Sequence, residues 1–167
     1  MMSQVFVSGH KSPDTDSIAA ALSYSYLKRR LGMDAVAVRA GEINKESRFA
    51  LDYFNLEEPI LVTSVARKNP EDEKQKVILV DHNESKQTID GMDDAEVLEI
   101  IDHHRFGDFE SENPIFILVR PVGCVNTVIY GLYKANHIKP SREIAGIMLS
   151  AIISDTVLFR SPTTTEE

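Results

Sequence analysis

Three short apolar runs, far apart in the chain, each end next to acidic or histidine residues. The run 5–9 (VFVSG) precedes His10, the run 76–80 (KVILV) precedes Asp81, and the run 97–101 (VLEII) precedes Asp102. Continuous apolar runs of this length are typical of strands that are buried on both faces. Because helical segments alternate with such runs, the pattern predicts an α/β fold with a largely parallel sheet.

The other segments fit the same fold. Apolar runs at 35–39, 60–63 and 116–119 predict three further strands, the last of them at an edge of the sheet. Helices are expected at 18–31, 44–54, 123–135 and 141–153. The last helix is almost entirely apolar, so we expect it to be buried. The charged segment 66–75 contains a proline and is interpreted as a solvated loop.

Composition limits the function classes. The chain has 167 residues, of which 43% are hydrophobic, and this suits one domain with its own core. A formal net charge of -8 argues against partners such as nucleic acid or anionic membrane, which attract basic surfaces. The chain shows neither a membrane-spanning run nor a signal-peptide pattern, and the single Cys124 cannot form an internal disulfide. We therefore expect a cytoplasmic protein.

The segment 10–16 (HKSPDTD) concentrates polar chemistry in one turn between a strand and a helix. Asp14 and Asp16 could serve only to cap the helix that follows. Capping explains one carboxylate, but it leaves His10 and the second carboxylate without a role. The turn is therefore a candidate for part of a functional site.

The carboxyl ends of parallel strands line one edge of a sheet, so the polar strand ends should converge. The candidate metal ligands are His10, Asp14, Asp16, Asp81, His103 and Asp155, with Asp102 and His104 close by. Four carboxylates in one crevice repel one another and require cations. Mixed oxygen and nitrogen ligands suit manganese, iron or cobalt, and their number fits two metals about 3.5 to 4 Å apart that activate a shared water for attack on phosphorus.

Other polar residues are assigned simpler roles. His82 and His137 are interpreted as surface histidines, and Cys124 as a small buried residue at a helix start. Asp102 could orient a metal-bound imidazole without binding the metal itself. Four further acids are expected to be solvated: Asp52, Asp90, Asp93 and Asp94.

Six blocks together resemble the family II inorganic pyrophosphatases, the manganese-dependent branch of the DHH phosphoesterase superfamily. They are GHKSPDTD at 9–16, VDHNE at 80–84, IDHHR at 101–105, PVGC at 121–124, SAIISD at 150–155 and LFRSP at 158–162. They span almost the whole chain in the order found in that family. The resemblance implies a Rossmann-like α/β domain, a homodimer formed through it, and hydrolysis of pyrophosphate to two phosphates by a metal-bridged hydroxide.

The resemblance also implies roles for individual residues. His10, Asp14 and Asp81 would hold one Mn²⁺, and Asp16, Asp81, His103 and Asp155 would hold another, with Asp81 as a bridging catalytic residue. His104 would contact the substrate and could donate a proton to the leaving phosphate. Co²⁺ or Mg²⁺ could substitute for manganese.

Members of the resembled family have a second domain that supplies Lys and Arg to the pyrophosphate. No such segment follows here, so we expect residues 1–167 to be the N-terminal metal-binding domain of a longer protein. A capping-box pattern from Thr163 to Glu166 also predicts the start of a further helix. Lys11 and Arg105 are too few to hold a polyanion. The chain alone should bind manganese and hydrolyse pyrophosphate weakly.

Two alternative functions remain open from the sequence. A DHH phosphodiesterase that acts on short nucleotides would share the metal ligands, but the chain offers few basic or aromatic residues for nucleotide strands. The chain could also be a non-catalytic module for metal binding or dimerisation. A dinucleotide-binding Rossmann site is disfavoured, because no G-x-G-x-x-G turn follows the first strand.

Overall fold

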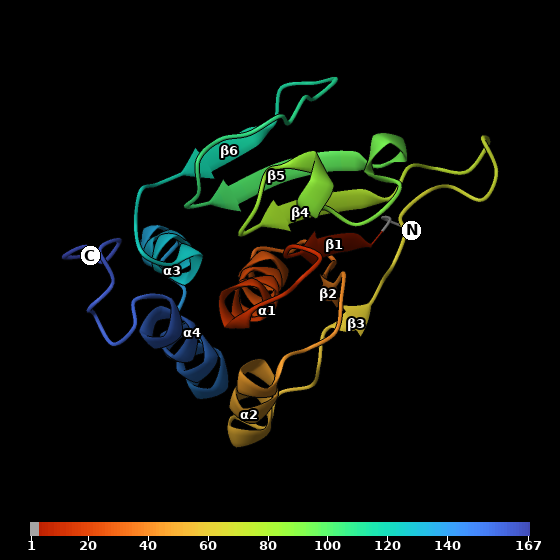
Figure 1. The fold of residues 1–167 in the computed structure, drawn as a ribbon. Coiled ribbons are helices and arrows are strands. Elements are labelled where there is room, and N and C mark those ends of the chain that lie inside the picture. The colour runs from red at the N-terminus through yellow and green to blue at the C-terminus, as the bar shows by residue number, and fades with distance from the viewer. Residues whose placement is uncertain (1–3) are drawn as a thin grey trace.

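A computed structural model describes residues 4–167, and a sheet of six strands runs through its centre (Figure 1). The strand order is β3-β2-β1-β4-β5-β6, and all neighbours pair in parallel. The predicted α/β fold and the edge position of the last strand are thus confirmed. The strands are β1 Val5–Ser8, β2 Ala35–Arg39, β3 Ile60–Leu61, β4 Lys76–Val80, β5 Glu96–Asp102 and β6 Phe116–Val119.

In residues 4–167 four α-helices accompany the sheet: α1 Thr15–Arg30, α2 Lys45–Tyr53, α3 Val125–Ala135 and α4 Arg142–Asp155. Two short 3₁₀ turns, η1 Ser85–Gln87 and η2 Met92–Asp94, follow β4. Helix α1 begins three residues earlier than predicted, because Asp14 caps it through the backbone N–H of Ser17. The prediction of a buried α4 was wrong: its outer face is exposed, and Leu149 retains 53% of its accessible surface.

The two faces of the sheet are covered differently. Figure 1 shows α1, α3 and α4 together on one side of the strands. Within the described residues no α-helix covers the other face, where loop residues Val65 and Ile89 pack on the strands instead. Side chains alternate between the faces, as expected for strands. The helix side receives Val5, Val7, Ile78, Val80 and Ile101, and the loop side receives Val38, Val77, Leu79 and Ile100.

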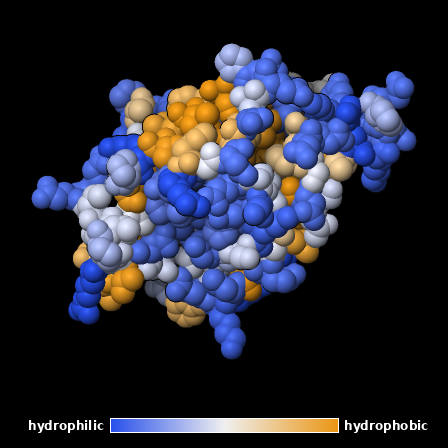
Figure 2. Space-filling model, turned by 45° about the horizontal axis from the view of Figure 1, so that its top comes forward, coloured by the Kyte–Doolittle hydropathy of each residue, from blue (hydrophilic) through white to orange (hydrophobic). Residues whose placement is uncertain are grey.

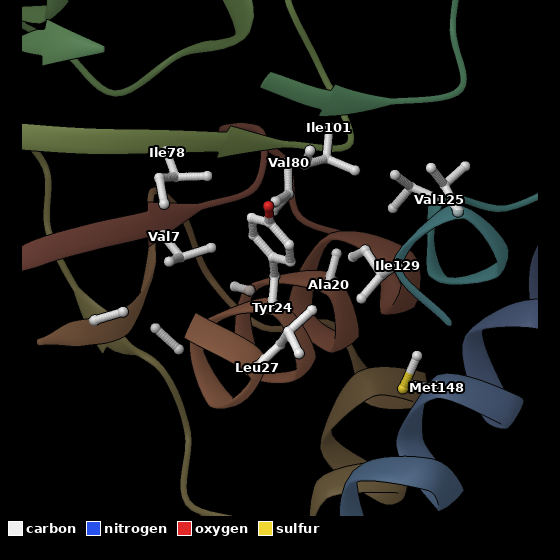
Figure 3. Packing of buried hydrophobic residues seen from close by; sticks show 14 of the residues in the cluster. Val7, Ala20, Tyr24, Leu27, Ile78, Val80, Ile101, Val125, Ile129 and Met148 are labelled. Carbon is white, nitrogen blue, oxygen red and sulfur yellow. The ribbon is translucent and has the colours of Figure 1, made fainter. Parts of the chain in front are cut away.

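Helix α1 lies in the middle of the helical layer. In Figure 3, its residues Ala20, Tyr24 and Leu27 face the strand residues, and Ile129 of α3 packs beside them. The Tyr24 hydroxyl donates to Glu99 on β5 at 2.6 Å, which satisfies the polar end of this buried ring. These contacts hold α1 against the sheet.

Two observations concern the rest of the chain. Residues 164–167 have no regular secondary structure, so the helix expected from the capping-box pattern is not formed in this chain. None of the helices in residues 4–167 combines the length and the apolar character that crossing a membrane requires.

Candidate metal centre

Three neighbouring strands deliver polar side chains to one edge of the sheet. His10 follows β1, Asp81 follows β4, and β5 ends in Asp102 before His103 and His104. Because β1, β4 and β5 are adjacent in the sheet, these residues meet, although His10 and Asp81 are more than 70 positions apart in the sequence. Asp81 adopts a left-handed backbone conformation with φ of 63°, which aspartate tolerates better than most residues.

The predicted ligands lie together in overlapping groups. In each of three groups, one nitrogen or oxygen atom per residue lies within 4.8 Å of the others: His10 with Asp14 and Asp81, Asp16 with His103 and Asp155, and Asp81 with His103 and His104. Asp81 and His103 each belong to two groups. The structure therefore brings together all six residues that were predicted to hold metal, while their role as ligands stays a prediction.

Asp81 is the central carboxylate, and only 1% of its surface is exposed. Its Oδ2 accepts a hydrogen bond from Ser17 Oγ at 2.7 Å and lies 3.4 Å from His10 Nε2. Its Oδ1 lies at ion-pair distance, 3.3 Å, from His103 Nε2, but within residues 4–167 no group donates a hydrogen bond to it. A buried oxygen without a partner, facing imidazole nitrogens, fits a site that is built for a cation.

Asp16 is buried at the N-terminus of α3. It accepts hydrogen bonds from the backbone N–H of Val125 at 2.7 Å, from the Asn126 amide at 2.6 Å and from Cys124 Sγ at 2.9 Å. The positive end of the helix dipole favours a carboxylate at this position. Its Oδ2 also lies 3.6 Å from His103 Nε2. Cys124 is fully buried at the helix start, as predicted.

Asp14 combines the two roles that the sequence left open. One oxygen accepts from the Ser17 N–H at 2.9 Å and caps α1. The other oxygen lies 3.6 Å from His10 Nε2 and faces the site. Capping therefore does not compete with a role at the site, because the two carboxylate oxygens serve different partners.

Crowding of acids changes the protonation of the site. Burial opposes a charge on His10 and on His103, but the neighbouring carboxylates outweigh it and raise the pKa of His10 to about 10 and that of His103 to about 9. Burial, followed by the charge of Asp16, raises the pKa of Asp155 to about 9. Burial and then the charge of Asp81 raise the pKa of Asp16 to about 6. Without other cations, protons compensate the acidic cluster.

Asp102 orients His104. The buried Asp102 Oδ1 lies 2.8 Å from His104 Nδ1 and accepts the backbone N–H of His103 at 2.7 Å, while Oδ2 accepts from Asn83 Nδ2 at 2.6 Å. The hydrogen bond to Asp102 raises the pKa of His104. The His104 side chain is 52% exposed, so its ring is anchored through Nδ1 while the side chain remains open to solvent.

The prediction that His82 lies on the surface was wrong. His82 is only 2% exposed, and its Nδ1 is 2.9 Å from the carbonyl oxygen of Val80. Its position directly after a buried strand and Asp81 was the signal that could have indicated burial. Burial lowers the pKa of His82, so it stays neutral beside the charged residues. His137 is exposed, as predicted.

Sequence reasoning also missed the residues that hold the carboxylates in place. Ser17 binds Asp81, Asn83 binds Asp102, and Asn126 binds Asp16. Ser17 and Asn126 lie within the first turns of helices, where a polar residue is usually interpreted as a local cap. Only Asn83 could have been predicted from the sequence, because it lies within the block VDHNE at 80–84.

Known proteins are similar to this chain in sequence over nearly its whole length. A protein of Bacillus licheniformis named "Probable manganese-dependent inorganic pyrophosphatase" is 53% identical over 166 residues, which cover 99% of this chain and 52% of that protein. A protein of the same name from Exiguobacterium is 51% identical with the same coverage. The chain thus spans about half the length of these curated relatives.

Solved structures give the same result for the fold. A candidate family II inorganic pyrophosphatase from Methanococcus jannaschii superposes with a TM-score of 0.86 at 41% identity, covering 98% of this chain and 52% of that chain. An exopolyphosphatase-related protein from Bacteroides fragilis, 19% identical, shares the fold with a TM-score of 0.69 over 98% of this chain and 49% of its own. The model of the DHH family, N-terminal domain, matches residues 4–152. The chain therefore belongs to the DHH family.

Proposed function

We propose that this chain is the metal-binding part of a manganese-dependent inorganic pyrophosphatase. Asp81 carries the proposal: this buried carboxylate is shared by two groups of potential ligands, and one of its oxygens has no hydrogen bond. Two Mn²⁺ per chain would use Asp81 as the bridge. One would be held by His10, Asp14 and Asp81, and the other by Asp16, Asp81, His103 and Asp155. The names of the relatives suggest the metal and the substrate, pyrophosphate.

The chain's own residues would prepare the reaction. Asp102 fixes the His104 ring through Nδ1, so a proton on Nε2 can be donated to the leaving phosphate. Ser17 and Asn126 hold Asp81 and Asp16 in fixed orientations. Manganese, when bound, would supply an acidified water and neutralise charge on the phosphates.

The chain alone should turn over pyrophosphate slowly. The two cationic side chains next to the site in sequence are already paired, Lys11 with Asp90 at 2.5 Å and Arg105 with Glu84 at 2.8 Å. A polyanionic substrate needs cationic side chains that are not already paired with carboxylates of the protein. We propose that a second domain outside this chain supplies them. Phosphate release at the rate of a full-length relative would refute this part of the proposal.

Metal stoichiometry tests the assignment directly. We expect the unmodified chain to bind two Mn²⁺, measured by titration with metal analysis of the dialysed protein. Asp81→Asn should weaken binding of both ions by more than about 100-fold. Substitution of residues that only hydrogen-bond to a metal ligand typically weakens metal binding by about 10- to 100-fold, and loss of a ligand should exceed this. Asp93→Asn is the matched control, because this acid is exposed on η2. Binding of two Mn²⁺ by the Asp81→Asn variant would contradict the bridging role.

The exposed edge of the sheet and the buried cysteine bear on assembly and location. We propose a homodimer formed through β6, the strand at one edge of the sheet. Phe116 and Ile117 on this strand are 49% and 43% exposed, and Figure 2 shows an apolar patch with this side of the molecule turned forward. We also propose a cytoplasmic location, which suits a single unpaired cysteine that is buried beside Asp16.

A further inference from the structure

Glu46, in the first turn of α2, connects α1 and α4, the two helices that carry the candidate ligands Asp16 and Asp155. Its Oε1 accepts hydrogen bonds from Thr15 Oγ1 and from Ser154 Oγ, the latter at 2.6 Å. Thr15 lies between Asp14 and Asp16 at the start of α1, and Ser154 precedes Asp155 at the end of α4. One carboxylate oxygen outside the site therefore joins the start of α1 to the end of α4.

Helix α2 is itself fixed, so Glu46 has a defined position. Asn44 caps the helix by accepting the Ser47 N–H at 2.7 Å, and the buried Ser47 Oγ lies 3.2 Å from Thr15 Oγ1. At the other end of α2, the Phe54 ring packs against Gly146 of α4, where a Cβ would come within 2.2 Å of it. Both ends of α2 are thus held against the helices that Glu46 connects.

The connection opposes a repulsion. Asp16 and Asp155 have ligand atoms within 4.8 Å of each other, so ionising both carboxylates would place two negative charges side by side and push α1 and α4 apart. Hydrogen bonds to an ionised carboxylate are about twice as strong as neutral ones. Glu46 makes two of them, and it touches none of the six candidate ligands through these bonds.

We infer that Glu46 is a positioning residue, which fixes Asp155 relative to Asp16 so that the Asp16–His103–Asp155 group binds a divalent cation. This inference rests on the proposed function, since that function makes the group a manganese site. Glu46 hydrogen-bonds to Thr15 and Ser154 and to none of the candidate ligands. Its effect should therefore be seen in metal affinity even without substrate.

The test measures Mn²⁺ affinity for this group alone. In an Asp14→Asn background, which disables the His10–Asp14–Asp81 group, Glu46→Ala should weaken Mn²⁺ binding by about 10-fold or more. Glu46→Gln keeps an acceptor oxygen for both hydroxyls and should recover most of the affinity. Asp52→Asn is the matched control: it removes one exposed acid from the same helix and should leave the affinity unchanged.

A second pair of variants separates positioning from general stability. Ser154→Ala removes one donor and should weaken binding in the same direction. Combined with Glu46→Ala, it should add little, because both changes break the same contact. Thermal melting of the metal-free variants identifies unfolding, which would lower the bound fraction without changing the affinity of the folded protein.

The outcomes are distinguishable. If the unmodified chain binds no Mn²⁺, the proposed function and this inference both fall. If the unmodified chain binds Mn²⁺ and Glu46→Ala binds it equally well, only this inference is overturned. Additive losses in the Ser154→Ala double variant would likewise contradict a shared contact.

Discussion

Protonation of single side chains determines how readily this site accepts a cation. Metal ligands must be deprotonated, yet His10, with a pKa of about 10, and His103 and Asp155, each with a pKa of about 9, carry protons near neutral pH. Binding of Mn²⁺ at about pH 7 should therefore release protons, and affinity should rise from about pH 6 to about pH 9. Calorimetry in two buffers with different ionisation enthalpies measures the release. Binding without proton release would contradict the protonated resting state.

The same residues predict how stability depends on pH. The pKa values of His10, His103 and Asp155 lie above those of the unfolded chain. The folded chain therefore binds more protons at Asp155 between about pH 4 and 9, and at the two histidines between about pH 6.5 and 10. The free energy of unfolding of the metal-free chain should therefore fall as pH rises towards about 10. With saturating Mn²⁺ this loss should disappear, since the cation replaces the protons. Melting temperatures of both forms across this range test the prediction, and a metal-free chain that gains stability with pH would refute it.

At the scale of elements, the contact between β1 and α1 depends on a glycine. A Cβ on Gly9 would lie 2.6 Å from Cβ and 2.8 Å from Oγ of Ser17, the residue that donates to Asp81. Gly9→Ala should push the first turn of α1 away from the strand end and cost roughly 1–3 kcal/mol of stability. It should also weaken Mn²⁺ binding, because Ser17 would move off Asp81. Chemical denaturation and metal titration measure the two effects.

Gly131 in α3 provides the opposite case. Nothing lies within 4 Å of a Cβ built at this position, which is inside a helix. Gly131→Ala should therefore stabilise the protein by about 0.5–1 kcal/mol and leave metal binding unchanged. Equal effects of the two substitutions in denaturation would show that the packing argument at Gly9 is wrong.

These elements also show what sequence patterns can predict. Continuous apolar runs identified β1, β4 and β5, and the geometry of parallel sheets was then sufficient to bring His10, Asp81 and His103 together. The exposure of Leu149 depends on which segment covers each face of α4, and the local sequence period does not contain this information. Glu46 could not be found either, because its partners lie 31 and 108 residues away on other elements.

At the scale of the whole molecule, charge and edge strands decide association. Two copies that each carry a net charge of -8 repel each other, so a dimer must rely on apolar contact and strand pairing. The sheet has two open edges, but β3 has two residues and β6 has four, so β6 offers the longer row of unpaired backbone groups. Salt should strengthen such a dimer, because screening reduces the repulsion between copies.

A charged residue on β6 tests this interface. Ile117→Lys would place two like charges close to the symmetry axis of a β6 dimer, and we expect it to weaken association by roughly 100-fold or more in sedimentation equilibrium. Ile60→Lys is the matched control, because Ile60 is 60% exposed on the opposite edge strand β3. Dissociation by Ile60→Lys but not by Ile117→Lys would move the interface to β3. An unmodified chain that sediments as a monomer at high salt would refute the dimer altogether. High salt screens the charge repulsion between copies, so the apolar contact and strand pairing at β6 would then be too weak to hold a dimer.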